Sequence, residues 1–160
     1  VGQVINSPEA GDSISTLRCV MTQRNFEGSK YQSTKDLNIR EIAALIRKDL
    51  KKYPTKDGYK FSVRSDIFSG GQSIAVTIRS IPENMTVETS EFVAWKEQNP
   101  HSSYFNAPQR YSDELTALID DVKDIVNAYN FDDSDSSSDY FHNNFYDSIR
   151  LDLEAKEGAA

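Results

Sequence analysis

Residues 38–79 read NIREIAALIRKDLKKYPTKDGYKFSVRSDIFSGGQSIAVTIR, and this stretch decides the fold because it joins a capped helix to a hairpin. Asn38 and Glu41 have the spacing of a capping box, in which each side chain accepts a free backbone amide at the start of a helix. The helix should run to about Tyr53, because Pro54 cannot continue it. Apolar residues at steps of three and four predict one buried stripe: Ile42, Ala43, Ile46, Leu50 and Tyr53.

Two alternating runs after this helix predict strands over 60–68 and 73–80, each with one buried face. The buried faces should carry Phe61, Val63 and Ile67 in the first strand and Ile74, Val76 and Ile78 in the second. Gly70 and Gly71 lie between the runs, where a hairpin loop needs a backbone that reaches positive φ.

A second helix and a last strand are expected nearer the C-terminus. Ser112 can cap a helix that runs to Tyr129, with acids in its first turn. Its buried stripe would be Leu115, Leu118, Ile119, Val122, Ile125, Val126 and Tyr129. Residues 140–153 alternate as a strand, with Phe141, Phe145, Ile149, Leu151 and Leu153 on one face and Tyr140, His142, Asn144, Tyr146 and Arg150 on the other. The predicted fold is α+β: a small antiparallel sheet of three or more strands with two helices packed on one face.

The length of 160 residues favours a single domain with its own core. Within residues 1–160, residues 1–35 form an N-terminal arm or an extra strand, 36–153 the core and 154–160 a tail. No apolar run approaches a membrane span, and the first residues lack a cationic segment followed by an apolar one. With the single cysteine, Cys19, these features predict a cytoplasmic protein that does not bind membranes.

Three pieces of residues 41–76 resemble a known family. They are EIAALIRKDLKK (41–52), KFSVRS (60–65) and GGQSIAV (70–76), and a later Asp-rich turn followed by a Tyr/Phe run at 130–146 is similar to the end of the same domain. The chain resembles a large polyvalent protein-associated domain, the twenty-ninth of that series, over residues 36–153. It departs from that pattern in an insertion at 80–112. The resemblance implies a phage or other mobile-element protein, and it implies no catalytic residues.

Charge is divided along the chain, whose net charge is −7. Residues 40–64 hold eight basic residues against three acidic ones, whereas residues 112–157 hold thirteen acidic residues against three basic ones. The two helices could simply neutralise each other side by side. Alternatively, the acids form a surface that docks on a basic protein: Asp113, Glu114, Asp120, Asp121, Asp124, Asp132, Asp133 and Asp135. The net charge argues against general DNA binding, although a local basic face keeps nucleic-acid binding open: Arg47, Lys48, Lys51, Lys52 and Arg64.

The insertion is a further candidate for a specific binding surface, because loops carry function more often than the elements that they connect. Its candidate residues are Trp95, His101, Tyr104 and Phe105. Residues 86–97 could form a strand or a helix, and 99–106 should be an exposed loop. His101 fits a solvated loop better than a catalytic site, since the sequence shows no partner for it.

The sequence motifs do not indicate enzymatic chemistry, a cofactor or a metal. The sequence contains no phosphate-binding loop, no dinucleotide-binding fingerprint and no nucleophile elbow with a serine. Asp133, Asp135 and Ser137 begin like a calcium loop, but Ser138 replaces the required glycine and Asn144 the bidentate glutamate, so a flexible turn is expected. We therefore expect a non-enzymatic interaction protein of a phage or mobile element, of the anti-CRISPR or anti-restriction type, that binds a host protein. The alternative is an accessory module that binds nucleic acid through the first helix.

Overall fold

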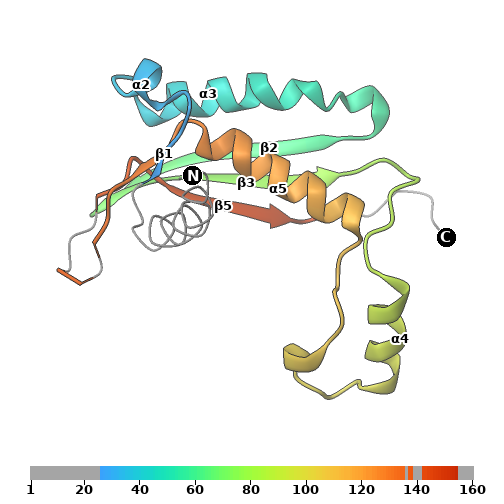
Figure 1. The fold of residues 1–160 in the computed structure, drawn as a ribbon. Coiled ribbons are helices and arrows are strands. Elements are labelled where there is room, and N and C mark those ends of the chain that lie inside the picture. Colours follow the sequence, from blue (N-terminus) through green and yellow to red (C-terminus); the bar gives the residue numbers. More distant parts are fainter. Residues whose placement is uncertain (1–25, 136, 139–141, 155–160) are drawn as a thin grey trace, which may run out of the picture.

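The computed structural model describes residues 26–135, 137–138 and 142–154 and has an α+β fold (Figure 1). The first 25 residues of the predicted N-terminal arm or extra strand, with Cys19, lie outside this described part, as do Tyr140 and Phe141. In chain order the elements are β1 (Phe26–Glu27), α2 (Tyr31–Thr34), α3 (Ile39–Asp49), 3-10 turns at Leu50–Lys52 and Thr55–Asp57, β2 (Lys60–Phe68), β3 (Gly71–Ser80), α4 (Ser90–Gln98), a 3-10 turn at Tyr104–Asn106, α5 (Asp113–Asn127), β4 (Phe131–Asp132) and β5 (Tyr146–Leu151).

Helix α3 begins as its sequence predicts. The Asn38 side chain accepts from the backbone amides of Arg40 and Glu41, both at 3.0 Å, and the Glu41 carboxylate accepts from the Asn38 amide at 2.8 Å. The capping box is thereby confirmed. The α-helix ends at Asp49 and continues as a 3-10 turn to Lys52, so the chain leaves the helix just before Pro54.

The hairpin of β2 and β3 is also confirmed. The strands pair antiparallel from Lys60 opposite Ser80 to Phe68 opposite Gly71, and Gly70 in the turn has φ +101°. Val63, Ile74, Val76 and Ile78 are buried. The prediction for Ile67 was wrong, because this side chain is 67% exposed. The turn end of the hairpin extends past the core, so side chains near the turn are exposed to solvent whichever face of the strand they lie on.

The third strand does not run as predicted. β5 pairs with β3 in parallel, from Ser73 opposite Tyr146 to Ile78 opposite Leu151, so the sheet has the order β2-β3-β5 and is mixed. Helix α5 returns the chain to the starting end of β3, and a strand that follows such a crossover must run parallel. The strand is also shorter than residues 140–153, because residues 142–145 form the approach to it.

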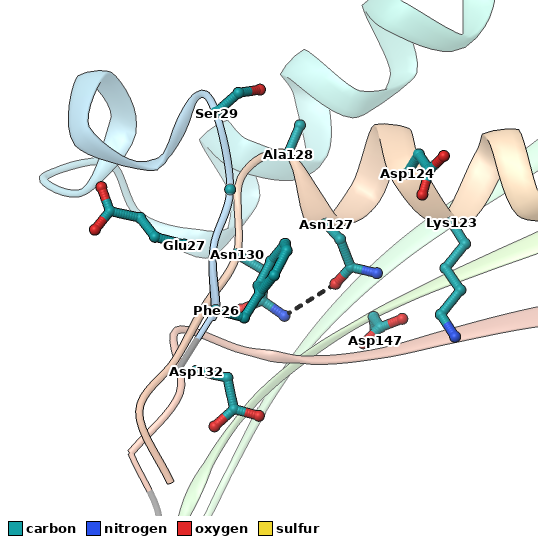
Figure 2. A pocket seen from close by; sticks show the side chains of 11 residues that line it. Phe26, Glu27, Ser29, Lys123, Asp124, Asn127, Ala128, Asn130, Asp132 and Asp147 are labelled. Atoms are coloured by element: carbon teal, nitrogen blue, oxygen red, sulfur yellow. Dashed lines mark hydrogen bonds between the residues drawn. The ribbon is translucent and has the colours of Figure 1, made fainter. Parts of the chain in front are cut away.

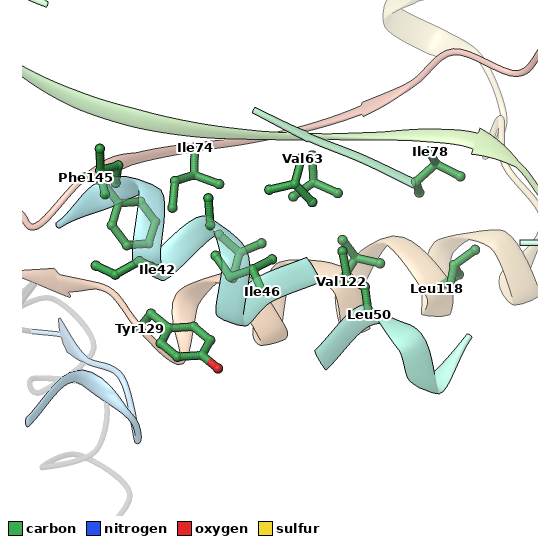
Figure 3. Close-up of a cluster of buried hydrophobic side chains, with 14 of the residues drawn as sticks. Ile42, Ile46, Leu50, Val63, Ile74, Ile78, Leu118, Val122, Tyr129 and Phe145 are labelled. Carbon is green, nitrogen blue, oxygen red and sulfur yellow. The ribbon is translucent and has the colours of Figure 1, made fainter. Parts of the chain in front are cut away.

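Helices α3 and α5 cover the same face of this sheet, as expected (Figure 1). One apolar core joins them to the strands (Figure 3). Its members include most residues of the predicted stripes of both helices, together with the buried side chains of β2 and β3 and Phe145. Tyr53, Ile119 and Ile125 of those stripes are partly buried and pack against this core. Ile149, Leu151 and Leu153 pack against it from β5 and the residues after it. Among the described residues, no helix is long and apolar enough to cross a membrane.

The segment before α3 is fastened to the end of α5 rather than free. The Gly28 amide donates to the Asn130 carbonyl at 2.9 Å, and the Lys30 amide donates to the Ala128 carbonyl at 2.8 Å. The bond to Ala128, the C-cap residue of α5, occupies a carbonyl group that the end of a helix otherwise leaves without a partner. β1 then pairs with β4 as a small second sheet. The described part of the predicted N-terminal arm, from Phe26 onward, is thus an integral part of the fold.

The insertion forms an arm that extends from the end of the sheet beyond β3 (Figure 1). Residues 86–97 adopt the helical alternative, since α4 begins at Ser90 with the Thr89 hydroxyl accepting from the Phe92 amide. Glu88 and Tyr111 form a bridge at the base of the arm, and the Ser112 amide donates to the Val87 carbonyl. The two halves of the arm are therefore tied together where they leave the body.

Replacing Gly28 with alanine should detach this N-terminal segment. A Cβ atom at this position would overlap the carbonyl oxygens of Asn127 and Ala128, so the backbone must move and strain its bond to Asn130. We expect Gly28→Ala to lower the free energy of unfolding by about 2 kcal/mol in urea denaturation, the usual cost of overpacking. Ser29→Ala, at the exposed neighbouring position, should change it little. Equal stability of the two variants would contradict the close packing of this segment.

Candidate functional site

Four acidic side chains lie along one face of α5, and we call them the acidic ridge. They are Asp113, Asp120, Asp121 and Asp124, whose spacing places them on the side of the helix opposite its buried stripe. Asp113, Asp120 and Asp124 are exposed, as is the neighbouring Glu114. The structure thus brings five of the eight predicted acidic residues together on a single helix.

The ridge is neutralised by α3 at one point only among the described residues. Lys52 Nζ lies 2.5 Å from Asp121 Oδ2, and the Tyr53 hydroxyl donates to the same oxygen. These two bonds hold the pKa of Asp121 below its ordinary value. Burial and the bond to Asp121 raise the pKa of the Tyr53 hydroxyl, which therefore stays protonated and donating at physiological pH. Mutual neutralisation of the helices is thus confirmed for Asp121.

A second link joins the two helices near the other end of α5. Lys30 Nζ lies 2.6 Å from Asp49 Oδ2, and the Tyr129 hydroxyl donates to the same oxygen at 2.5 Å. Burial opposes ionisation of Asp49, but the bonds from Lys30 and Tyr129 outweigh it and lower the pKa of this carboxyl. The pKa of Lys30 is raised, chiefly by its bond to Asp49. The C-terminal part of α5 is therefore held between α3 and the N-terminal segment.

The ridge ends in a cavity of about 470 Å³ beside the last turn of α5 (Figure 2). We call it the acidic cavity. Its lining includes four carboxylates from four different elements, namely Glu27 of β1, Asp124 of α5, Asp132 of β4 and Asp147 of β5. Among the described residues of the lining, Lys123 is the one that is basic. Because Asp124 belongs both to the ridge and to the cavity, the two form one continuous acidic surface.

The buried side chain of Asn130 holds the walls of this cavity in place. Its amide nitrogen donates to the Phe145 carbonyl at 3.0 Å, and its carbonyl oxygen accepts from the amides of Phe131 and Phe145 at 2.9 and 3.2 Å. These bonds join the strand after α5 to the approach to β5. The cavity therefore has a fixed wall in the region from which Asp132 and Asp147 project.

Asp133 and Asp135 lie apart from the acidic cavity, in the turn that follows β4. The Asp135 carboxylate accepts from the side chain and amide of Ser137 and from the hydroxyl of Ser138. These bonds lower the pKa of Asp135, and they satisfy its carboxylate with donors from the same turn. Within the described residues no group of three or more His, Cys, Asp or Glu side chains is arranged to hold a metal ion.

The insertion residues are found on the arm, away from the acidic cavity. Phe92, Trp95 and Tyr104 pack as a ring cluster, with centroids 5.9 to 6.2 Å apart. Tyr104 is nevertheless 60% exposed, and Phe105 is 91% exposed. His101 is exposed in the loop between them and α4. The arm therefore presents aromatic side chains to solvent, as expected for a binding surface.

The predicted basic face is not a single surface. Lys52 pairs with Asp121, and Arg47 donates to the Val63 carbonyl at 2.7 Å. Lys48 and Lys51 remain exposed on the outer side of α3 and its 3-10 extension. Arg64 alternates with the buried Val63 and so lies on the face of the sheet that α3 does not cover. The five residues therefore cannot contact one ligand together.

Sequence reasoning missed two of the four carboxylates in the cavity. Glu27 belongs to the predicted N-terminal arm or extra strand and Asp147 to the predicted strand over 140–153, and neither was predicted as part of a charged surface. No motif links either residue to Asp124, because their proximity depends on the β1–β4 pairing and on the parallel crossover. A signal was present for the crossover, since a helix between two strands favours parallel pairing.

Comparison with protein-family models, with curated proteins and with solved structures finds no match for this chain. The resemblance to the large polyvalent protein-associated domain therefore stays a prediction. The site must be interpreted from its own geometry.

Asp121 should make stability depend on pH in the acid range. Folding lowers the pKa of Asp121, so the ionised carboxylate stabilises the folded state. This stabilisation is fully present above about pH 5, and it is lost as the pH falls through the pKa of an unfolded aspartate and then through the lower pKa of the folded state. We expect Asp121→Asn to be less stable than the parent protein at neutral pH, and the difference to narrow below about pH 4. Urea denaturation across this range measures both effects. Asp120→Asn, one residue away, removes an exposed carboxylate outside the ion pair and is the control for the loss of charge alone. A stability difference for Asp121→Asn that stays constant with pH would refute the ion pair.

Proposed function

We propose that this chain is a non-enzymatic interaction protein that binds a basic partner protein through the acidic ridge and the acidic cavity. The observation that carries the proposal is that four acidic residues from four elements, Glu27, Asp124, Asp132 and Asp147, line one cavity at the end of the ridge. Four carboxylates against one lysine give the lining a net negative charge, which favours a cation as its occupant.

The chemistry of the occupant follows from the shape and charge of this surface. A Lys or Arg side chain has a long stem and a cationic end, and the cavity can accept it while the ridge meets further positive charges of the partner. Arg is favoured because its guanidinium binds carboxylates through two parallel hydrogen bonds. Charge complementarity of this kind speeds association and selects partners.

The most specific form of the proposal is an inhibitor of a host defence nuclease, of the anti-CRISPR or anti-restriction type, acting in the cytoplasm of a bacterial host. An acidic ridge can occupy the basic groove in which such a nuclease holds nucleic acid. The resemblance to mobile-element domains supports this setting. The purified protein should then lower DNA cleavage by the sensitive nuclease. Equal inhibition after neutralising the ridge would exclude this mechanism.

Binding of an octa-arginine peptide tests the acidic cavity directly. The double substitution Asp124→Asn and Asp132→Asn keeps the size of both side chains but removes two of the four lining charges. We expect the Kd measured by fluorescence anisotropy to rise about tenfold, equivalent to about 1.4 kcal/mol. The affinity of the parent protein should fall as salt is added, because the contacts are partly solvent-exposed ion pairs.

A variant with the same loss of charge elsewhere provides the control. Asp36 and Asp57 are exposed and lie outside the cavity lining. Their double substitution to asparagine should change the Kd less than about twofold if the interaction is local. If both double variants weakened peptide binding equally, net charge rather than the cavity would explain it, and the proposed site would be wrong.

A further inference from the structure

A second cavity, of about 260 Å³, lies between the C-terminal part of α3 and the start of β2. We call it the aromatic groove. Three rings and three cations are among its lining residues: Tyr53, Tyr59, Phe61, Arg47, Lys51 and Lys60. None of its lining residues in the described chain is acidic. Although the chain has a net charge of −7, the charged side chains among the described lining residues of this groove are all cationic.

The cations differ in how freely they can meet a ligand. Arg47 is anchored by its bond to the Val63 carbonyl, which fixes its guanidinium at the rim. Lys60 pairs with Glu154 at 3.0 Å, but both side chains are about half exposed, so a stronger anion can replace the carboxylate at little cost. Lys51 is exposed and forms no ion pair with the described part of the chain. The groove therefore has one fixed and two adaptable donors for an anion.

The three rings provide an aromatic wall. Tyr59, just before β2, and Phe61, within it, have nearly parallel rings, with 6° between their planes and 6.4 Å between their centroids. Tyr53 meets both rings at a tilt, with centroids 4.9 and 5.9 Å away. All three side chains are only partly buried, so their packing against the core leaves ring surface available in the groove.

From this arrangement we infer a binding site for a nucleoside phosphate, whose base stacks on the ring wall of the aromatic groove while its phosphate is bound by Lys51, Lys60 and Arg47. Stacking on aromatic side chains next to cations is how proteins bind unpaired bases without selecting a sequence. The volume of about 260 Å³ is close to the lower end of the range of about 300–1,000 Å³ that is usual for small-ligand sites, so the groove can hold no more than a small ligand. The ligand is either a free nucleotide or an unpaired residue of a single strand.

This inference does not rest on the proposed docking function, because it concerns a different cavity and a ligand of opposite charge. It also differs from the basic face predicted by sequence. Only Arg47 and Lys51 of that set line the groove, whereas Lys60 and the aromatic residues were not in it. A failure of one proposal therefore leaves the other in place.

The test measures binding of two probes to the full chain by calorimetry at low ionic strength: AMP and a thymidine octanucleotide. Lys51→Gln removes an exposed cation of the groove, and Lys48→Gln removes an exposed cation that does not line it. We expect Lys51→Gln to raise the Kd of the bound probe about tenfold and Lys48→Gln to raise it less than about twofold. Tyr59→Leu should weaken probe binding while the variant still unfolds cooperatively on heating. Tyr59→Phe keeps the ring and should bind the probe as the parent protein does.

The outcomes separate the possible sources of the ligand. Binding of both probes indicates a free nucleotide site, and binding of the octanucleotide alone indicates an unpaired residue of a single strand. Inorganic phosphate, as a third probe, should bind more weakly than AMP because it has no base to stack. The inference is wrong if neither probe binds, if phosphate binds as tightly as AMP, or if Lys48→Gln weakens binding as much as Lys51→Gln.

Discussion

The packing of α5 across β3 and β5 is the constraint on which the rest of the molecule depends. This helix buries Leu115, Leu118, Val122 and Val126 in the core that it shares with α3 and the sheet. Its opposite face must then be exposed, and that face carries the acidic ridge. Because the helix also returns the chain to the start of β3, it fixes β5 as a parallel strand and brings Asp147 beside Asp124.

The links between α3 and α5 also separate the two candidate sites. Tyr53 lines the aromatic groove with its ring and donates to Asp121 of the acidic ridge with its hydroxyl. Lys52 pairs with the same carboxylate. A positively lined groove and a negatively lined cavity can thus coexist on neighbouring helices, because the charges between them are paired. The net charge of the chain describes neither site, since each depends on local charge.

Local features were predictable from the sequence, and those that depend on chain direction were not. The Asn38 cap, the stripes of α3 and α5 and the β2–β3 hairpin all follow from short-range patterns and are confirmed. The direction of β5 depends on a connection of more than sixty residues between it and β3, which no periodicity reports. The acidic face of α5 was predictable from helical spacing, whereas Glu27 and Asp147 join it only through tertiary pairing. The basic residues were predicted as one face, but alternation along β2 places Arg64 on the other side of the sheet.

NMR of the full, isotope-labelled chain can distinguish the two proposed binding surfaces of opposite charge. Titration with octa-arginine should shift the backbone amides of residues 120–132, which include the C-terminal half of α5 and β4. Titration of the same sample with the thymidine octanucleotide should instead shift the amides of residues 47–61. Shifts in the same residues for both probes, or shifts spread evenly over the molecule, would contradict the account.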